Sequence, residues 1–170
     1  MRRPAERTGP SRWDFRPSHL SATAGHAATV MIVVAVDGSE SSARAVRWAA
    51  EHASGVGASV VAVHALEEPV YAVPPMVAVS MGPLPPEVRA EIHATLERDW
   101  CAPLAEAGVE FRAVLVDGPP AAAIIRLAES EEADLVVVGS RGRGGFSELL
   151  LGSVSHQLAH HVGRPLVIVP

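Results

Sequence analysis

Lysine is absent from this chain of 170 residues, and all 14 of its basic residues are arginine. Without lysine the chain cannot form a Walker-A phosphate loop, a Schiff base on a lysine, or any site with a catalytic lysine amine. A bias this complete is typical of a GC-rich coding sequence, so we interpret it as codon usage and not as a functional signal.

Cysteine occurs once, at Cys101, so no disulfide can form within the chain. A single cysteine fits a reducing cytoplasm, and we expect a small buried hydrophobic residue here rather than a catalytic thiol. Long apolar runs are also missing, since none approaches the roughly 20 residues that a membrane-spanning helix needs. These absences predict a cytoplasmic protein with no membrane partner.

Positive charge is scarce in most of the chain. From Met31 onward nine arginines stand against 17 acidic residues, so this part has a net charge of −8. Such a surface repels polyanions, and no basic patch large enough for nucleic acid is visible. We therefore expect no nucleic-acid partner, and any bound phosphate must be held by local geometry.

Residues 1–30 differ in composition from residues 31–170, which we predict to form one domain. The first 30 residues hold five arginines, two acids and several Pro, Gly, Ser and Thr residues without sustained apolar periodicity, and they lack the apolar stretch of a secretory signal. We interpret them as a disordered N-terminal extension, or as the result of a start codon assigned too early, because Met31 directly begins the first expected strand. An arginine-rich arm that touches a partner is a third interpretation.

Short apolar runs alternate with helical patterns along residues 31–170. The runs are rich in β-branched residues and predict buried parallel strands at 31–36, 58–66, 109–116, 134–139 and 165–169. Capping residues and apolar spacing predict helices over about 39–54, from Glu87 with a restart at Pro103, from Pro119 or Pro120, and over 153–161. This alternation predicts an α/β fold, an open parallel sheet of five strands with helices on both faces.

Residues 67–86 interrupt this alternation. They are rich in proline and contain valine-rich stretches that fit neither a helix nor a strand clearly, so we predict a long, semi-rigid loop. The helix that follows has one apolar face at i+4 spacing, formed by Val88, Ile92, Leu96 and Trp100.

A glycine-rich segment near the C-terminus carries the strongest functional signal. It reads Gly139-Ser-Arg-Gly142, then nine residues, then Gly152-Ser153. Glycine accepts φ > 0 and lets a ligand approach its backbone N–H closely. An expected strand precedes the segment and an expected helix follows it, so unpaired N–H groups and a positive dipole end lie where an anion can bind.

The spacing G-x2-G-x9-G-S/T resembles the signature of the ATP-binding branch of the universal stress protein family. Further segments resemble the family as well, so that the resemblance covers residues 31–170: Ile32–Ser39, Val63–Leu66, Gly118-Pro119 and Arg164–Val169. The resemblance implies a Rossmann-like fold with strand order 3-2-1-4-5. That order puts the ends of strands one and four, with Asp37 and Gly139, side by side at the switch point where ligands bind.

The same resemblance implies a set of nucleotide contacts. They are Ala35, Asp37, Ala65, Gly139, Ser140, Arg141, Gly142, Arg143, Gly144, Gly145, Gly152, Ser153 and Val154. Asp37 would hold the ribose or a Mg²⁺ ion of the triphosphate, the alternative being an Asx turn that caps the next helix. Arg141 and Arg143 are placed to reach phosphate oxygens, although solvated loop charges explain them equally well. The two alanines leave room for a flat base, or are ordinary core residues, and residues 143–151 form a flap if the loop closes.

Other chemistry has weaker support. His156 and His160 lie at i, i+4 and His161 follows, a spacing that suits a transition metal, but no second cluster is spaced to complete the site. No GxSxG motif occurs, and no Ser/His/Asp arrangement is suggested by spacing. We therefore expect no catalytic residue and at most weak ATP hydrolysis.

Three functional hypotheses follow. The first is a cytoplasmic stress-response or signalling protein that binds ATP, with Mg²⁺ on the triphosphate, as an effector. The second is a slow ATPase or nucleotidyl-transfer enzyme of the related α/β group, although the S-G-G-x-D-S loop of those enzymes is absent after the first strand. The third is a nucleotide-free interaction module. The family resemblance also implies a homodimer through the last strand, 165–169, whose apolar edge needs covering.

Overall fold

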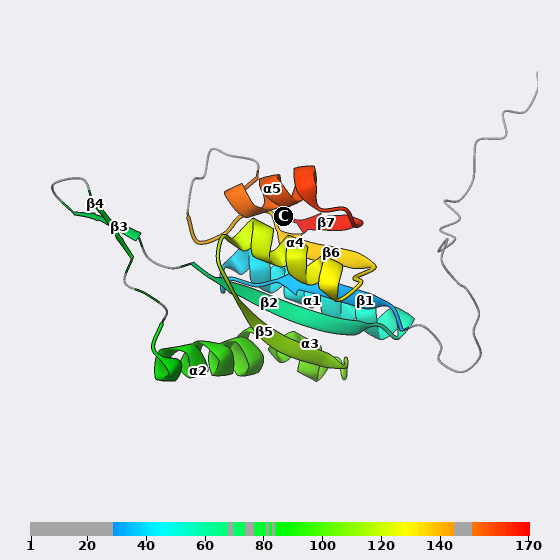
Figure 1. Ribbon diagram of the computed structural model, residues 1–170. Coiled ribbons are helices and arrows are strands. Elements are labelled where there is room, and N and C mark those ends of the chain that lie inside the picture. The colour runs from blue at the N-terminus through cyan, green and yellow to red at the C-terminus, as the bar shows by residue number, and fades with distance from the viewer. Residues whose placement is uncertain (1–28, 68–69, 74–76, 81, 83, 145–150) are drawn as a thin grey trace, which may run out of the picture.

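Five parallel strands form the central sheet in the order β5-β2-β1-β6-β7 (Figure 1). In chain order they are β1 (Met31–Ala35), β2 (Ser59–Leu66), β5 (Phe111–Asp117), β6 (Leu135–Gly139) and β7 (Leu166–Val169). Counted among themselves, these strands have the expected order 3-2-1-4-5. The central strand β1 pairs on both sides, so that Val33 lies opposite Val61 and Val136.

The computed structural model describes residues 29–67, 70–73, 77–80, 82, 84–144 and 151–170, with the backbone alone for 70–73 and 77–80. The predicted N-terminal extension lies outside the described residues except for its last two. The predicted flap at 143–151 also lies outside them for the most part, and so does Gly145.

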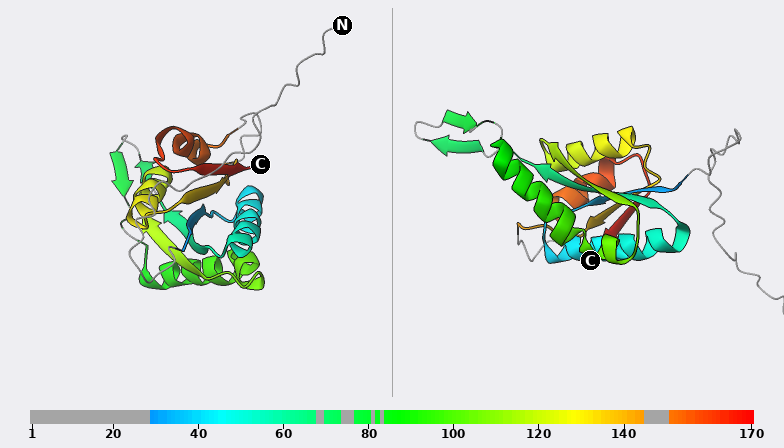
Figure 2. Two further views of the ribbon diagram at one scale, coloured as in Figure 1. Left: turned by 90° about the vertical axis from the view of Figure 1, so that its right-hand side faces the viewer. Right: turned by 90° about the horizontal axis from the view of Figure 1, so that it is seen from below.

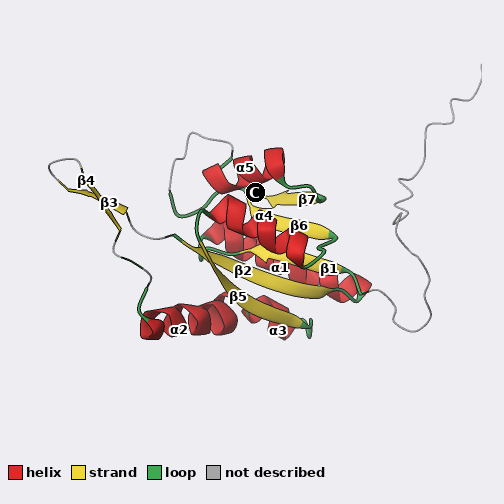
Figure 3. Ribbon diagram, viewed as in Figure 1, coloured by secondary structure: helices red, strands yellow, loops and turns green. Residues whose placement is uncertain are grey.

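Helices cover both faces of the sheet (Figures 2 and 3). On one face lie α1 (Glu40–Val56) and α3 (Ala102–Glu106), and on the other lie α4 (Pro120–Ser130) and α5 (Ser153–His161). Successive side chains of a strand point to opposite faces, so Ile32 and Val34 pack toward α1 while Val33 packs toward α4 and α5. All three are fully buried, as a strand covered on both faces requires. In the part of the chain that the structure describes, no helix is both long and apolar enough to cross a membrane.

Helix α1 begins and ends at the residues that its sequence favours. Ser39 is the N-cap, and its Oγ accepts a hydrogen bond from the N–H of Ser42 at 3.2 Å. Gly57 ends the helix in the left-handed conformation with φ of 68°, and its N–H bonds to the carbonyl of Ala53. The capped start places the first turn of α1 directly after the end of β1.

The second helical region is divided into three pieces. Helix α2 (Pro86–Thr95) continues into a π-helical turn, η1 (Leu96–Trp100), and Pro103 lies in the first turn of α3, where the restart was predicted. Leu96 is fully buried, but Val88 is 40% exposed, so the predicted apolar face is wrong in its first turn. Helix α2 is tied to the end of the edge strand by polar contacts instead, since Arg89 donates to both carboxylate oxygens of Asp117 at 2.6 and 2.8 Å.

Cys101 lies between η1 and α3 and is fully buried in the core on the α1 face. Burial and the nearby charge of Glu97 raise the pKa of its thiol to about 12. The expectation of a small buried hydrophobic residue is therefore confirmed.

Two short antiparallel strands, β3 (Val70–Val73) and β4 (Val77–Ser80), occur where a loop without strands was expected. That prediction was wrong for these residues, because valine-rich stretches on both sides of 74–76 adopt the extended backbone that β-branched residues favour. The hairpin extends away from the central sheet (Figure 1).

Candidate functional site

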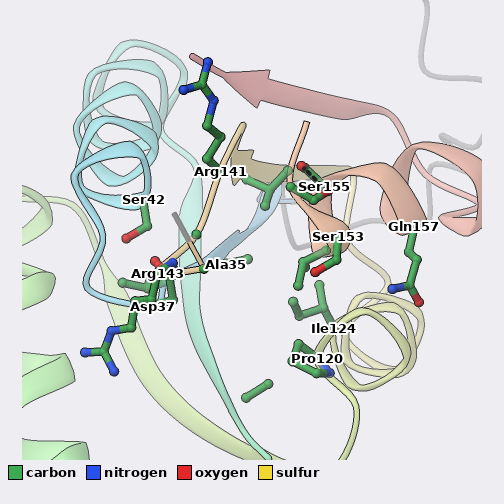
Figure 4. A pocket seen from close by; sticks show the side chains of 18 of the residues that line it. Ala35, Asp37, Ser42, Pro120, Ile124, Arg141, Arg143, Ser153, Ser155 and Gln157 are labelled. Carbon is green, nitrogen blue, oxygen red and sulfur yellow. Dashed lines mark hydrogen bonds between the residues drawn. The ribbon is translucent and has the colours of Figure 1, made fainter. Parts of the chain in front are cut away.

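A pocket of about 960 Å³ opens at the carboxyl ends of the central strands (Figure 4). The chain leaves β1 toward β2 on one side, while β6 lies against β1 on the other, so this is the topological switch point of the sheet. Crevices of this kind are the usual ligand sites of open parallel sheets.

Eleven of the thirteen residues expected at a nucleotide site line this pocket: Ala35, Asp37, Ala65, Gly139, Arg141, Gly142, Arg143, Gly144, Gly152, Ser153 and Val154. Ser140 is not among the lining residues and instead borders a neighbouring cavity of about 550 Å³ beside the end of β7. Gly145 lies outside the described residues. The pocket thus brings together residues from β1, β2, the loop after β6 and the start of α5, while their contact with a nucleotide stays a prediction.

Asp37 follows β1 and lines the pocket. Its Oδ1 accepts a hydrogen bond from the N–H of Ser39 at 2.9 Å, and its Oδ2 accepts one from the N–H of Arg143 at 3.1 Å. Burial alone would raise the pKa of Asp37, but hydrogen bonds from Ser39, Ser42 and Arg143 outweigh it and hold that pKa below its ordinary value. The carboxylate is therefore anionic at neutral pH, and it combines the predicted Asx-type turn with a tie to the glycine loop.

The three glycines of the motif lie where an added side chain would crowd its neighbours, most severely at Gly139. A Cβ on Gly139 would lie 2.7 Å from the carbonyl carbon of Ser41, and a Cβ on Gly142 would lie 2.6 Å from Oδ2 of Asp37. A Cβ on Gly152 would lie 3.3 Å from Cα of Arg141. Glycine therefore lets the loop lie close to α1 at Gly139, and substitutions at Gly142 and Gly152 would displace Asp37 or the loop backbone, apart from any need to approach a ligand.

The N-terminus of α5 opens into the pocket without a capping side chain. Its N-cap is Gly152, in an extended conformation, and no side-chain cap hydrogen bond is present among the residues that the structure describes. Ser155 instead donates its hydroxyl to the carbonyl oxygens of Ser140 and Gly152, at 2.8 and 3.0 Å. Ser153 faces the pocket in Figure 4. This helix end offers N–H donors and a positive dipole to an anion.

The two loop arginines lie in different surroundings. Arg141 is directed away from Asp37 toward the end of β7, where it also borders the neighbouring cavity with Arg44 (Figure 4). The guanidinium carbon of Arg143 lies 5.4 Å from the ring centroid of Trp100, over the ring. Only Arg143 keeps its side chain at the Asp37 side of the pocket.

Several lining residues were not predicted from the sequence. They are Val36, Ser42, Val63, His64, Leu66, Glu67, Pro120, Ile124, Val138, Leu151, Ser155, His156 and Gln157. Many follow from the sheet order alone, because they extend the carboxyl ends of β1, β2 and β6. The lining residues on α4 could not be predicted, because the apolar spacing that includes Ile124 indicates only a residue of the hydrophobic core. The apolar residues among all these lining residues, together with Ala35 and Ala65, make part of the pocket lining apolar.

His64 has a defined tautomer in this pocket. Its Nδ1 lies 2.7 Å from the carbonyl oxygen of Val36, which can only accept, so Nδ1 carries the proton. Its ring meets the edge of Trp100 with centroids 5.2 Å apart. The histidine joins the end of β2 to η1.

Two histidines of α5 lie near one another, but a third metal-ligating side chain placed to complete a site with them is missing from the described residues. The rings of His156 and His160 lie 4.7 Å apart, but the described residues contain no group of three His, Cys, Asp or Glu side chains that could hold a metal ion. The carboxylate of Asp37 has the chemistry of a Mg²⁺ ligand in a site that also contains phosphate. A single anionic carboxylate, together with phosphate oxygens, is how Mg²⁺ is commonly held in nucleotide sites.

Comparisons with known proteins agree with this architecture. The model of the universal stress protein family matches residues 31–170. Universal stress protein YxiE of Bacillus subtilis is 33% identical over 145 residues, 81% of this chain and 97% of that protein. A universal stress protein of Thermus aquaticus is 34% identical over 139 residues, 81% of this chain and 96% of that protein.

A solved structure of a universal stress protein in complex with cAMP is also similar. Its TM-score is 0.62 at 29% identity, and the match covers 84% of this chain and 98% of that one. The fold, the switch-point pocket and these matches lead to one conclusion: the chain belongs to the universal stress protein family.

Proposed function

We propose that this protein binds ATP in the switch-point pocket and uses it as an effector in stress response or signalling, with slow or no hydrolysis. The adenosine would lie against the apolar lining that includes Ala35, Ala65 and Ile124, and the phosphates at the glycine loop. The observation that carries the proposal is the uncapped N-terminus of α5, which opens into a pocket of about 960 Å³ next to that loop.

The arrangement of charge supports a phosphorylated ligand. The start of α5 and Arg143 both line the pocket, and Asp37 adds a negative charge beside the backbone of Arg143. A Mg²⁺ ion bound with the triphosphate would relieve repulsion between Asp37 and the phosphates. We therefore expect ATP affinity to depend on Mg²⁺, and Asp37→Ala to weaken both the binding and that dependence.

The state of Asp37 supports slow turnover. Its lowered pKa makes the carboxylate a weak base, and both of its oxygens already accept hydrogen bonds. Asp37 would therefore be a poor general base for a water molecule that attacks the phosphates. Single-turnover hydrolysis with Mg²⁺ tests the point, because rates near the 1–100 s⁻¹ typical of kinases would favour the enzyme hypothesis.

Calorimetric titration with adenosine, AMP, ATP and cAMP, each with and without Mg²⁺, tests the function itself. We expect ATP with Mg²⁺ to bind most tightly, and a matched thermal shift to rise with ligand concentration, since a ligand of the native state stabilises it by mass action. Absence of any adenine-nucleotide binding to the folded protein would contradict the proposal.

Cyclic AMP is the second candidate effector, favoured by the complex reported for the similar structure. Its single cyclic phosphate would engage the helix N-terminus without needing Mg²⁺. Binding of cAMP tighter than that of ATP, and unaffected by Mg²⁺, would select this alternative.

Homodimerisation belongs to the same proposal. Strand β7 lies at the sheet edge with apolar, half-buried residues, and an edge of this kind needs covering. Two copies could pair there about a two-fold axis. Sedimentation should report a dimer at micromolar concentration that Val167→Lys dissociates, while a monomeric parent protein would contradict this. The cytoplasmic location stays a prediction.

A further inference from the structure

Trp100 comes from η1 and reaches the turn that follows β1. Its six-membered ring lies against Gly38, because a Cβ added at Gly38 would be 2.6 Å from Cζ2 of Trp100. The same added Cβ would lie 3.1 Å from a terminal nitrogen of Arg143. The indole and the guanidinium therefore meet over the bare Cα of Gly38, one residue from Asp37.

The guanidinium of Arg143 is held without an ion pair to a described carboxylate. Its carbon lies 5.4 Å from the Trp100 centroid, within the roughly 6 Å over which a ring attracts a cation. The backbone N–H of the same residue bonds to Asp37 at 3.1 Å. A guanidinium held over an aromatic ring can still donate its N–H groups to another acceptor. In a salt bridge the same N–H groups already donate to the carboxylate.

Trp100 is itself fixed from two further sides. His64 meets it edge-on at 5.2 Å, and it packs against the buried core cluster that contains Leu96 and Cys101. An anchored ring lowers the number of positions that a long arginine side chain samples, and so lowers the entropy cost of engaging a ligand. The pair thus has the properties of a preorganised phosphate contact.

We propose that Trp100 is a positioning residue for nucleotide phosphate: it holds the Arg143 guanidinium at the Asp37 side of the pocket, so that phosphorylated nucleotides bind in preference to the nucleoside. This inference rests on the proposed nucleotide function and adds to it a residue and a basis for specificity. Trp100 does not line the pocket, so it acts through Arg143.

The test compares four variants of the full-length chain in titrations with ATP and with adenosine: Arg143→Gln, Trp100→Leu, Trp100→Phe and the double variant of the first two. We expect Arg143→Gln and Trp100→Leu each to weaken ATP binding about 10-fold, which is the effect of about 1.4 kcal/mol. Adenosine affinity should change less than about 2-fold. Trp100→Phe keeps an aromatic face and should recover most of the ATP affinity, and the double variant should lose no more than either single one.

Two matched controls separate this role from a general one. Arg47→Gln removes a positive charge from an exposed residue of α1 that is not among the pocket residues, and Trp48→Leu removes the tryptophan that stacks on His52 at 4.8 Å. Neither should alter the ratio of ATP to adenosine affinity. In addition, ATP but not adenosine should shift the tryptophan emission of the parent protein, and Trp100→Phe should abolish the shift.

The outcomes are distinct. Equal loss of ATP and adenosine affinity in Trp100→Leu would make the residue merely structural, and tighter ATP binding would mean that the ring sequesters the cation; either result overturns the proposal. If Trp100→Leu fails to fold, Arg143→Gln decides, because an unchanged ratio of ATP to adenosine affinity there overturns it as well. A parent protein that binds no nucleotide would instead remove the proposed function on which this inference rests.

Discussion

Arg141 and Arg143 are separated by one glycine on the loop after β6, and their side chains serve different neighbourhoods. Arg141 extends toward the end of β7 and shares a cavity with Arg44, whose Nε donates to the carbonyl oxygen of Pro170. Arg143 lies over Trp100 beside Asp37. The same residue type in one short loop therefore has two different environments, set by what the fold brings to each side of it.

Removing Gly139 should disturb both sides of the loop and gives the largest expected effect. In Gly139→Val the new side chain would meet backbone atoms of Ser41 and Ser42 at 2.7 and 2.8 Å, and these cannot move without displacing α1. We expect a loss of about 3 kcal/mol in the free energy of unfolding, measured by urea denaturation. Gly144→Val is the control, because no atom of the described residues lies within 4 Å of a Cβ there. A similar loss in both variants would contradict the close approach of the loop to α1.

A substitution at Gly38 should disturb the contacts around Trp100 and Arg143 and leave the surroundings of Arg141 unchanged. Gly38 has φ of 76°, so Gly38→Ala combines a strained backbone with a contact of 2.6 Å on Trp100. The left-handed backbone costs about 1–2 kcal/mol, and displacement of the ring should shift tryptophan emission. Gly57→Ala has a comparable positive φ but nothing within 4 Å, so it should lose stability without changing the emission. An unaltered emission in Gly38→Ala would show that the ring does not depend on this glycine.

The difference between the two arginines can be measured directly through ATP affinity. Since Arg141 is directed toward β7, Arg141→Gln should weaken ATP binding by about 3-fold or less, compared with about 10-fold for Arg143→Gln. Calorimetric titration at one salt concentration provides both values. Equal losses would mean that both side chains reach the phosphates in the bound state.

The smallest expected effect concerns the carboxylate that ties the loop to β1. The pKa of Asp37 is lower in the folded protein than in the unfolded chain, so its charge stabilises the fold above the unfolded pKa, and that contribution is lost as pH falls through the folded value. Asp37→Asn should therefore be less stable than the parent near pH 7 without nucleotide. The difference should shrink in acid, below the ordinary pKa of 3.8. Urea denaturation at several pH values measures this difference in the free energy of unfolding. A difference that does not change with pH would contradict a stabilising role for the Asp37 charge.

Much of the fold could be predicted from the sequence because its signals are local. Alternation of β-branched runs with capped helices is enough for an α/β sheet, and Ser39 and Pro103 mark real helix starts. The strand order came from family resemblance, since alternation alone is compatible with other orders. The start of β5 was predicted two residues early because Val109 is apolar and buried, yet its N–H bonds to Leu104 in a turn before the strand.

The candidate site was predictable where its residues lie in segments that resemble the family, such as the glycine loop and the ends of the first two strands. The glycine loop and Asp37 carry spacing that can be recognised, whereas Trp100 looked like one more residue of an apolar helix face. Its contact with Gly38 joins segments far apart in the chain, and periodicity contains no information about such contacts. For the same reason the sequence could not separate Arg141 from Arg143.

The buried thiol of Cys101 can report how often the region around it opens, through the rate at which it is alkylated. A thiol with a pKa of about 12 and no exposed surface hardly reacts while the fold is closed, so an alkylating reagent labels it only when η1 and α3 separate from the core. The labelling rate in excess reagent then counts excursions of this region from the native state. Because Cys101 directly follows Trp100, the same rate should report how often the support beneath Arg143 comes apart.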